Sequence, residues 1–154
     1  MSYQKPLPAD CIGYATRRAS NAVTAFYNAA LRRNDLSMAQ FGLLVTVRRQ
    51  PGLTISGISD RVMIDESTMT RNLAVLRNRG LICIEGGGGR AGKQILLTEA
   101  GEDLAAEAEA QWQEARDRLN AIMGRETIEQ GIAILERLEA AICELRQDPA
   151  PPER

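Results

Sequence analysis

The amino-acid sequence predicts a mainly α-helical protein with one small β-hairpin and a lobe of long helices that pairs with a second copy. Three observations support this fold class. Apolar residues recur at helical spacing, turn and capping residues divide that pattern into helix-length segments, and a glycine run separates two short strand-like segments. Of the 154 residues, 44% are hydrophobic, which is enough to bury a substantial interior.

Two helices are expected in the first third of the chain. Asp10 can cap a long first helix, and the asparagine–aspartate pair at 34–35 ends it, because these residues favour turns. Ser37 and Gln40 have the spacing of a capping box for a second helix. The proline–glycine pair at 51–52 closes that helix.

A short helix, a turn and another helix are expected next. Thr54 or Ser56 can cap the short helix, and Asp65 precedes a new periodic run that it can cap. Gly80 suits the position just after the end of this run. A helix pair followed by a hairpin is the order of a winged helix-turn-helix, whose usual ligand is the DNA major groove.

The second helix of this pair has an apolar and a polar face. Met69, Leu73 and Leu76 recur at helical spacing and form one apolar stripe. The other face gathers hydroxyl, amide and guanidinium groups, which suit base edges and phosphates, and Arg71 is the strongest candidate for such a contact. An ordinary solvated face is the alternative. The candidate DNA-contacting residues of this helix are Ser67, Thr68, Thr70, Arg71, Asn72 and Arg77.

Two short strands, Ile82–Glu85 and Gln94–Leu97, are expected on either side of a glycine-rich tip. Arg90 and Lys93 lie on this tip, from which a basic side chain can reach the negative potential of a narrow minor groove. The alternative is a loop with incidental charge.

The same loop partly matches a phosphate-binding motif of nucleotide hydrolases. Gly87, Gly92 and Lys93 fit its spacing, but Gln94 stands where serine or threonine would hold magnesium, and a strand is expected where the motif needs a helix. The chain contains no histidine, which removes the usual histidine-dependent nucleophiles and zinc sites. We therefore expect no enzymatic activity, no cofactor and no metal site.

Two long helices are expected after the hairpin. Thr98 can cap the first of them, and Gly124 separates it from the second. These helices and the first helix carry more apolar surface than one thin domain can bury. Pairing with a second copy would bury it and would present two recognition helices to successive major grooves. A monomeric six-helix bundle is the alternative.

Charge is distributed unevenly, although the net charge is only −1. Residues 61–93 carry six basic and three acidic side chains, whereas residues 98–148 carry five basic and thirteen acidic ones. A basic centre beside an acidic C-terminal half would orient the molecule on a polyanion. We find no bilayer-length apolar run and no signal peptide, and so expect a cytoplasmic protein without membrane contact.

Four segments, in a fixed order along the chain, carry a resemblance to a known family. They are Leu36-Ser37-Met38-Ala39-Gln40-Phe41, Asp65-Glu66-Ser67-Thr68-Met69-Thr70-Arg71-Asn72-Leu73, Leu76-Arg77-Asn78-Arg79-Gly80-Leu81-Ile82 and Leu97-Thr98-Glu99-Ala100-Gly101. In these segments the chain resembles the multiple-antibiotic-resistance regulator (MarR) family. The resemblance implies a homodimeric bacterial transcription factor, usually a repressor, that binds a palindromic operator in double-stranded DNA.

The resemblance also implies roles for particular residues. The family's recognition helix matches Glu66–Arg79 and its wing arginine matches Arg90, although Gly88 stands where the family often has aspartate. Many members release DNA when a small aromatic or phenolic acid binds between the two lobes, and others when a cysteine is oxidised. Candidate pocket residues, chosen by position, are Arg17, Arg18, Phe41 and Trp112; surface pairing and core packing are the alternative.

Cys11 and Cys143 lie on helices assigned to the dimer lobe, where they could form a disulfide or a thiolate metal or metalloid site. The alternative is that both are small apolar packing residues. The expected division is an N-terminal arm and dimerisation helix (1–34), a winged helix-turn-helix DNA-binding domain (35–98) and C-terminal dimerisation helices (99–154). A winged-helix module that binds a protein and not DNA is the alternative function.

Overall fold

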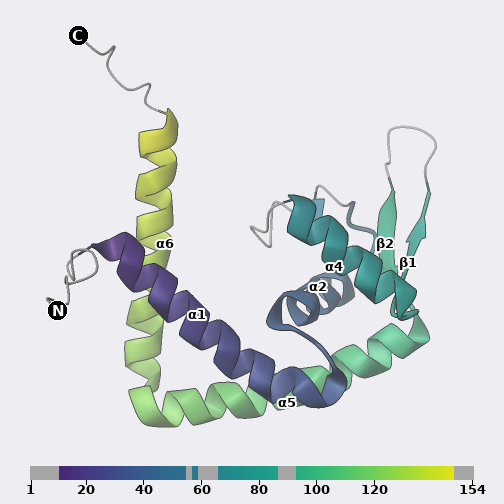
Figure 1. The fold of residues 1–154 in the computed structure, drawn as a ribbon, viewed down its shortest axis with the longest axis horizontal. Coiled ribbons are helices and arrows are strands. Elements are labelled where there is room, and N and C mark those ends of the chain that lie inside the picture. The colour runs from purple at the N-terminus through teal and green to yellow at the C-terminus, as the bar shows by residue number, and fades with distance from the viewer. Residues whose placement is uncertain (1–10, 55–56, 59–65, 87–92, 148–154) are drawn as a thin grey trace, which may run out of the picture. The chain divides into compact units, whose positions relative to one another are not determined.

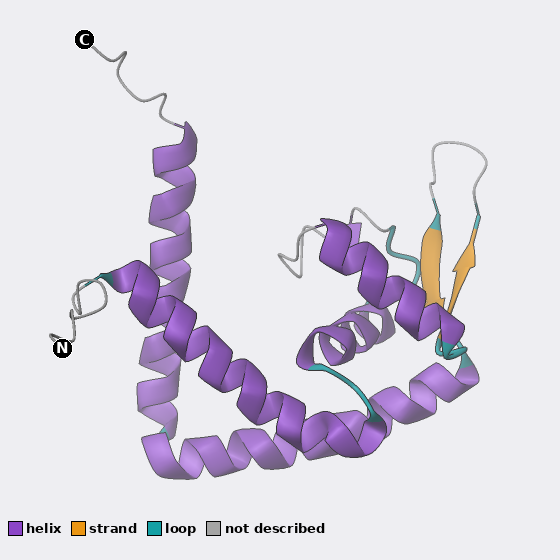
Figure 2. Cartoon of the chain, viewed as in Figure 1, coloured by secondary structure: helices purple, strands orange, loops and turns teal. Residues whose placement is uncertain are grey.

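The computed structural model describes residues 11–54, 57–58, 66–86 and 93–147. The chain divides into two compact units, Met1–Gln113 and Glu114–Arg154 (Figure 1). The described elements are helix α1 (Ile12–Ala30), the 3₁₀ helix η1 (Leu31–Asn34), α2 (Met38–Arg49), α4 (Glu66–Asn78), strands β1 (Ile82–Glu85) and β2 (Gln94–Leu97), α5 (Glu99–Met123) and α6 (Arg125–Gln147). The predicted mainly helical fold with a single small hairpin is confirmed for this part of the chain (Figure 2).

The junction between the first two helices is built from local signals. The N-cap of α1 is Cys11, whose side chain makes no capping hydrogen bond, and not the predicted Asp10, which lies outside the described residues. The predicted break at 34–35 is confirmed, because η1 ends there and Asp35 adopts a left-handed conformation with φ of 52°. A short turn over 35–37 then leads into α2.

The predicted capping box of α2 is confirmed. The Ser37 hydroxyl accepts a hydrogen bond from the Gln40 backbone N–H at 3.2 Å, and the Gln40 side chain accepts one from the Ser37 N–H at 3.0 Å. A third contact comes from α1, where the Asn28 side-chain oxygen accepts a hydrogen bond from the Met38 N–H at 2.7 Å. Three donors at the start of α2 are thereby satisfied without water.

The hairpin has the predicted strand bounds. β1 and β2 pair antiparallel, with Ile82 opposite Leu97 and Glu85 opposite Gln94. Outside this two-stranded sheet, Thr54 forms an isolated antiparallel bridge to Gln94, and the Ile95 N–H donates to the Leu53 carbonyl at 3.0 Å. A strand over 94–97 contradicts the phosphate-binding-loop alternative, which needs a helix there.

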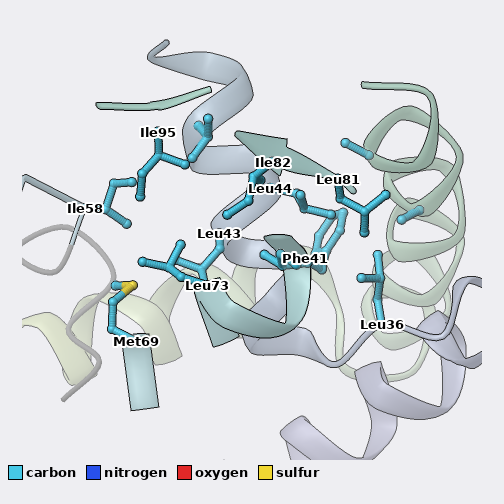
Figure 3. Packing of buried hydrophobic residues seen from close by; sticks show 14 of the residues in the cluster. Leu36, Phe41, Leu43, Leu44, Ile58, Met69, Leu73, Leu81, Ile82 and Ile95 are labelled. Carbon is cyan, nitrogen blue, oxygen red and sulfur yellow. The ribbon is translucent and has the colours of Figure 1, made fainter. Parts of the chain in front are cut away.

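One hydrophobic cluster holds the first unit together. Helix α4 contacts α2 and β1, and α2 contacts β2. Met69 and Leu73 point from α4 into the cluster, where they meet side chains of α2 and the hairpin (Figure 3). Each fully buried side chain of this size contributes roughly 1.5–3 kcal/mol to stability. The described members are Leu31, Leu36, Phe41, Leu43, Leu44, Val47, Ile58, Met69, Leu73, Leu76, Leu81, Ile82, Ile95, Ala105 and Ala108.

The long helices keep much of their apolar surface exposed. Gly124, with φ of 80°, separates α5 from α6, as predicted. Large apolar residues are exposed on α1, at the end of α5 and along α6; Leu145, for example, is 74% exposed. None of the described helices combines the length and the hydropathy that crossing a membrane requires.

Candidate nucleic-acid interface

Helix α4 has one buried face and one polar exposed face. Met69 and Leu76 are completely buried. Ser67, Thr70 and Arg71 are exposed in the first half of the helix. This orientation follows from the 3.6-residue period, because the apolar stripe turns inward and leaves the positions opposite it in solvent. Polar donors and acceptors therefore line the outer side of a helix whose inner side is fixed.

The remaining candidates on α4 lie at the edges of its polar face. Thr68 and Asn72 are partly exposed, whereas Arg77 is exposed in the last turn. Arg77 and Thr70 also border a hollow of about 140 Å³ between α4 and the hairpin, whose apolar wall includes Ile84. Helix α4 contacts strand β1, so the helix and the hairpin lie side by side (Figure 2).

Of the two basic residues predicted on the wing, one is described. Lys93 is exposed immediately before β2. Arg90 lies outside the described residues, so its position stays a prediction. Exposed cations on a surface of this kind attract phosphate through long-range electrostatics.

A tight junction fixes the C-terminal end of α4. The Gly80 N–H donates to the Arg77 carbonyl at 2.9 Å and the Leu81 N–H donates to the Leu76 carbonyl at 3.0 Å. This is the Schellman pattern, which requires the left-handed conformation that Gly80 adopts with φ of 71°. The predicted role of Gly80 is confirmed.

The start of α5 packs onto this junction. The Thr98 hydroxyl donates to the Gly80 carbonyl at 2.6 Å and accepts from the Gly101 N–H at 3.1 Å, so it caps α5 while it holds α4. The Thr98 N–H donates to the Leu81 carbonyl at 3.1 Å. Gly101 lies against the same carbonyl oxygen, so closely that a Cβ atom would overlap it. These contacts explain why threonine suits position 98 and why glycine suits position 101.

Sequence reasoning missed the contacts of Arg79 and Arg48 with segments far away along the chain. The Arg79 guanidinium donates to the carbonyl oxygens of Asp35 at 2.6 Å and Asn34 at 3.0 Å. The Arg48 guanidinium contacts Glu102 at 3.1 Å and Glu109 at 2.9 Å, which links α2 to α5. Sequence periodicity could not indicate partners this far apart along the chain.

The four predicted pocket residues are only partly brought together. Phe41 and Trp112 are neighbours, with ring centroids 6.0 Å apart, and they border a hollow of about 210 Å³ between α2 and α5. Arg17 and Arg18 are exposed on α1 and are not among the residues that line this hollow. The charged groups at its rim are instead Arg49 and Glu109, which pair at 3.3 Å.

The two predicted redox or metalloid cysteines lie in different compact units. Cys11 is half-buried at the start of α1, and Cys143 is exposed on α6. Both thiols are free, and their approach to one another stays a prediction. The described residues include no group of three or more acidic or cysteine side chains arranged to hold a metal ion.

Comparison with known proteins places this geometry in one family. A family model described as "MarR family" matches residues 34–91, which include α2, α4 and β1. No match was found among curated proteins. Among solved structures, the M. tuberculosis transcriptional regulator MosR is 31% identical, with a TM-score of 0.75, over 86% of this chain and 98% of that chain.

Two further structures give the same picture. MosR in complex with DNA is 30% identical, with a TM-score of 0.74 and the same coverage of 86% and 98%. A MarR-family transcriptional regulator from Rhodococcus sp. RHA1 is 25% identical, with a TM-score of 0.74, over 86% of this chain and 95% of that chain. The matched domain and the identity to MosR over nearly its whole length show that the chain belongs to the MarR family of transcriptional regulators.

Proposed function

We propose that this chain is a homodimeric DNA-binding regulator that represses transcription from a palindromic operator. The single observation that carries the proposal is the polar outer face of α4, held by a buried inner face beside the hairpin. The complex of MosR with DNA supports it, because that protein shares the fold and 30% of its residues with this chain. In this proposal residues 35–98 form the DNA-binding domain, and the helices before and after it form the dimerisation lobe.

The dimer is supported by apolar surface that the single chain leaves in solvent. Ile12 is 56% exposed on α1, and Leu135 and Leu145 are 50% and 74% exposed on α6. Burial of such surface by a second copy is the usual driving force for association. Sedimentation should give a species with twice the chain mass of 16.9 kDa. A single-copy species at micromolar concentration would contradict the proposal.

Base reading is assigned to the N-terminal half of α4. Ser67, Thr70 and Arg71 would face base edges, and Thr68, Asn72 and Arg77 would contact bases or phosphates beside them. Arg90 and Lys93 would bind backbone or minor groove from the wing.

A duplex selected by the wild-type protein from a random library tests this assignment. Arg71→Ala should weaken binding to it by about 1–3 kcal/mol, roughly 5- to 150-fold, if this guanidinium reads a base. Arg118→Ala is the matched control, because it removes an exposed arginine from the acidic C-terminal half. Equal losses in the two variants, or a wild-type protein that selects no sequence, would count against the assignment.

We further propose that a small aromatic or phenolic acid releases the operator. Its ring would enter the hollow beside Phe41 and Trp112, which combines aromatic walls with a charged rim. A thermal-shift screen of hydroxybenzoic and hydroxycinnamic acids should find compounds that raise the melting temperature and lower operator affinity. Ligands that bind without changing operator affinity would exclude this form of regulation.

An oxidative signal is the second release mechanism that the sequence offers. Cys143 is exposed in the single chain, and solvent exposure is one of the conditions for oxidation of a thiol by peroxide. Mild peroxide should lower operator affinity in the wild type and not in Cys143→Ser. If mass spectrometry shows no oxidised or crosslinked cysteine and affinity is unchanged, the redox mechanism is removed.

A further inference from the structure

The contact between Arg79 and the turn after η1 connects the end of α4, the proposed recognition helix, to the segment between α1 and α2. Arg79 follows the last residue of α4, and its backbone N–H still bonds to the Val75 carbonyl at 3.0 Å. Its guanidinium crosses to the segment between α1 and α2 and donates to two successive backbone oxygens there, those of Asn34 and Asp35. Both hydrogen bonds carry the charge of the guanidinium, which makes them stronger than neutral ones.

The receiving turn is itself firmly held. Leu31 and Leu36, on either side of it, are 0% and 4% exposed. The Asp35 N–H donates to the Arg32 carbonyl at 3.1 Å, and Asp35 adopts a left-handed conformation with φ of 52°. Asn34 is only 5% exposed, so its carbonyl needs a partner within the protein, and Arg79 is the described one.

Arg79 and Arg77, although only two positions apart, have different surroundings. Arg77 lies on the hairpin side of α4 and borders the hollow beside Ile84. Arg79 lies on the opposite side, and its guanidinium is occupied by backbone oxygens of the η1 turn. Two of the five guanidinium N–H groups of Arg79 are used in this way, and they anchor the side chain to the turn after η1.

We propose that Arg79 is a positioning residue that fixes the recognition helix relative to α1, and thereby sets the operator spacing that the dimer accepts. The inference rests on the proposed function, in which α1 belongs to the dimerisation lobe and α4 reads DNA. Two recognition helices must meet half-sites about 34 Å apart, so a small shift of α4 against α1 changes the spacing that fits. Helix α4 is also held by its core contacts with α2 and β1 and, through Gly80 and Thr98, by the start of α5, whereas the described hydrogen bonds to the turn after η1 come from Arg79.

The test measures spacing preference and not affinity alone. Wild-type protein first selects its operator from a random duplex library, and affinities are then compared for that operator and for versions with one base pair added or removed between half-sites. Arg79→Met removes the donors and keeps most of the side-chain stem, whereas Arg79→Lys keeps the charge but loses the planar fork. Arg33→Met is the control for loss of one exposed charge on η1. Melting temperatures are recorded for all variants.

The wild type and Arg33→Met should discriminate against altered spacing by the same ratio. In Arg79→Met that ratio should fall by about three- to tenfold, the scale of a partly exposed hydrogen bond to a charged group, with Arg79→Lys in between. An unchanged ratio in Arg79→Met would overturn the inference while leaving the proposed function intact. The inference would also be overturned if Arg79→Met had a lower melting temperature and lost affinity equally at every spacing. A wild-type protein that selects no duplex would overturn the proposed function itself.

Discussion

Replacing Gly101 with alanine places a methyl group where the structure has a backbone oxygen. An added Cβ would overlap the Leu81 carbonyl oxygen, which cannot move aside as a flexible side chain could. The same oxygen accepts the Thr98 N–H at 3.1 Å, and the Thr98 hydroxyl bonds to the Gly80 carbonyl at 2.6 Å. Relieving the overlap therefore pulls α5 away from the end of α4.

The magnitude follows from opposing contributions. Helix propensity alone would make alanine more stable than glycine by about 1 kcal/mol. The overlap costs about 1–3 kcal/mol, as overpacking in a dense region does, and each weakened Thr98 hydrogen bond costs about 1 kcal/mol. Gly101→Ala should therefore lower the free energy of unfolding by about 2 kcal/mol, which corresponds to a fall in melting temperature of about 4–8 °C for a chain of this size.

Gly42→Ala is the matched control, because Gly42 is also helical and has nothing within 4 Å of its added Cβ. This variant should be more stable than the wild type by about 0.5–1 kcal/mol. Urea and thermal unfolding at one fixed protein concentration measure both changes, since dimer stability depends on concentration. If Gly101→Ala proves as stable as the wild type, the close approach of α5 to Leu81 is not a constraint and the reasoning fails.

Three further predictions concern single contacts. Ser37→Ala removes the capping box of α2 and should lower the free energy of unfolding by about 1 kcal/mol in urea titrations; an unchanged midpoint would contradict it. Arg48→Met breaks partly exposed ion pairs with Glu102 and Glu109 and should cost less than about 1 kcal/mol, a difference that molar salt abolishes. Lys93→Ala should reduce the slope of log operator affinity against log salt by about 1, and an unchanged slope would remove Lys93 from the phosphate contacts.

Several helix boundaries could be predicted from the sequence, because capping depends on residues close together in the chain. The Ser37 capping box, the left-handed Gly80 and the Thr98 cap each depend on residues within a few positions, so spacing alone revealed them. The cap of α1 shows the limit of this reasoning. Asp10 is the better capping residue, but α1 begins after Cys11.

Contacts between segments far apart in the sequence could not be predicted. Arg79 and Asp35 are 44 residues apart, and Arg48 and Glu109 are 61 apart, so their pairing depends on the fold and not on any local pattern. The candidate pocket residues were likewise predicted only in part. Phe41 and Trp112 meet because both lie on apolar stripes that the core brings together, whereas no such constraint acts on Arg17.

The aromatic contacts of Trp112 give the protein a built-in optical reporter. It is the only tryptophan in the chain, and its indole stacks on Tyr27 of α1 at 6.3 Å between ring centroids, with Phe41 of α2 on another side. Indole emission depends on its surroundings, so intrinsic fluorescence should follow the junction of α1, α2 and α5 without any added label. Titrations with duplex DNA or small aromatic acids can then be followed directly at the place where α1, α2 and α5 meet in the first unit.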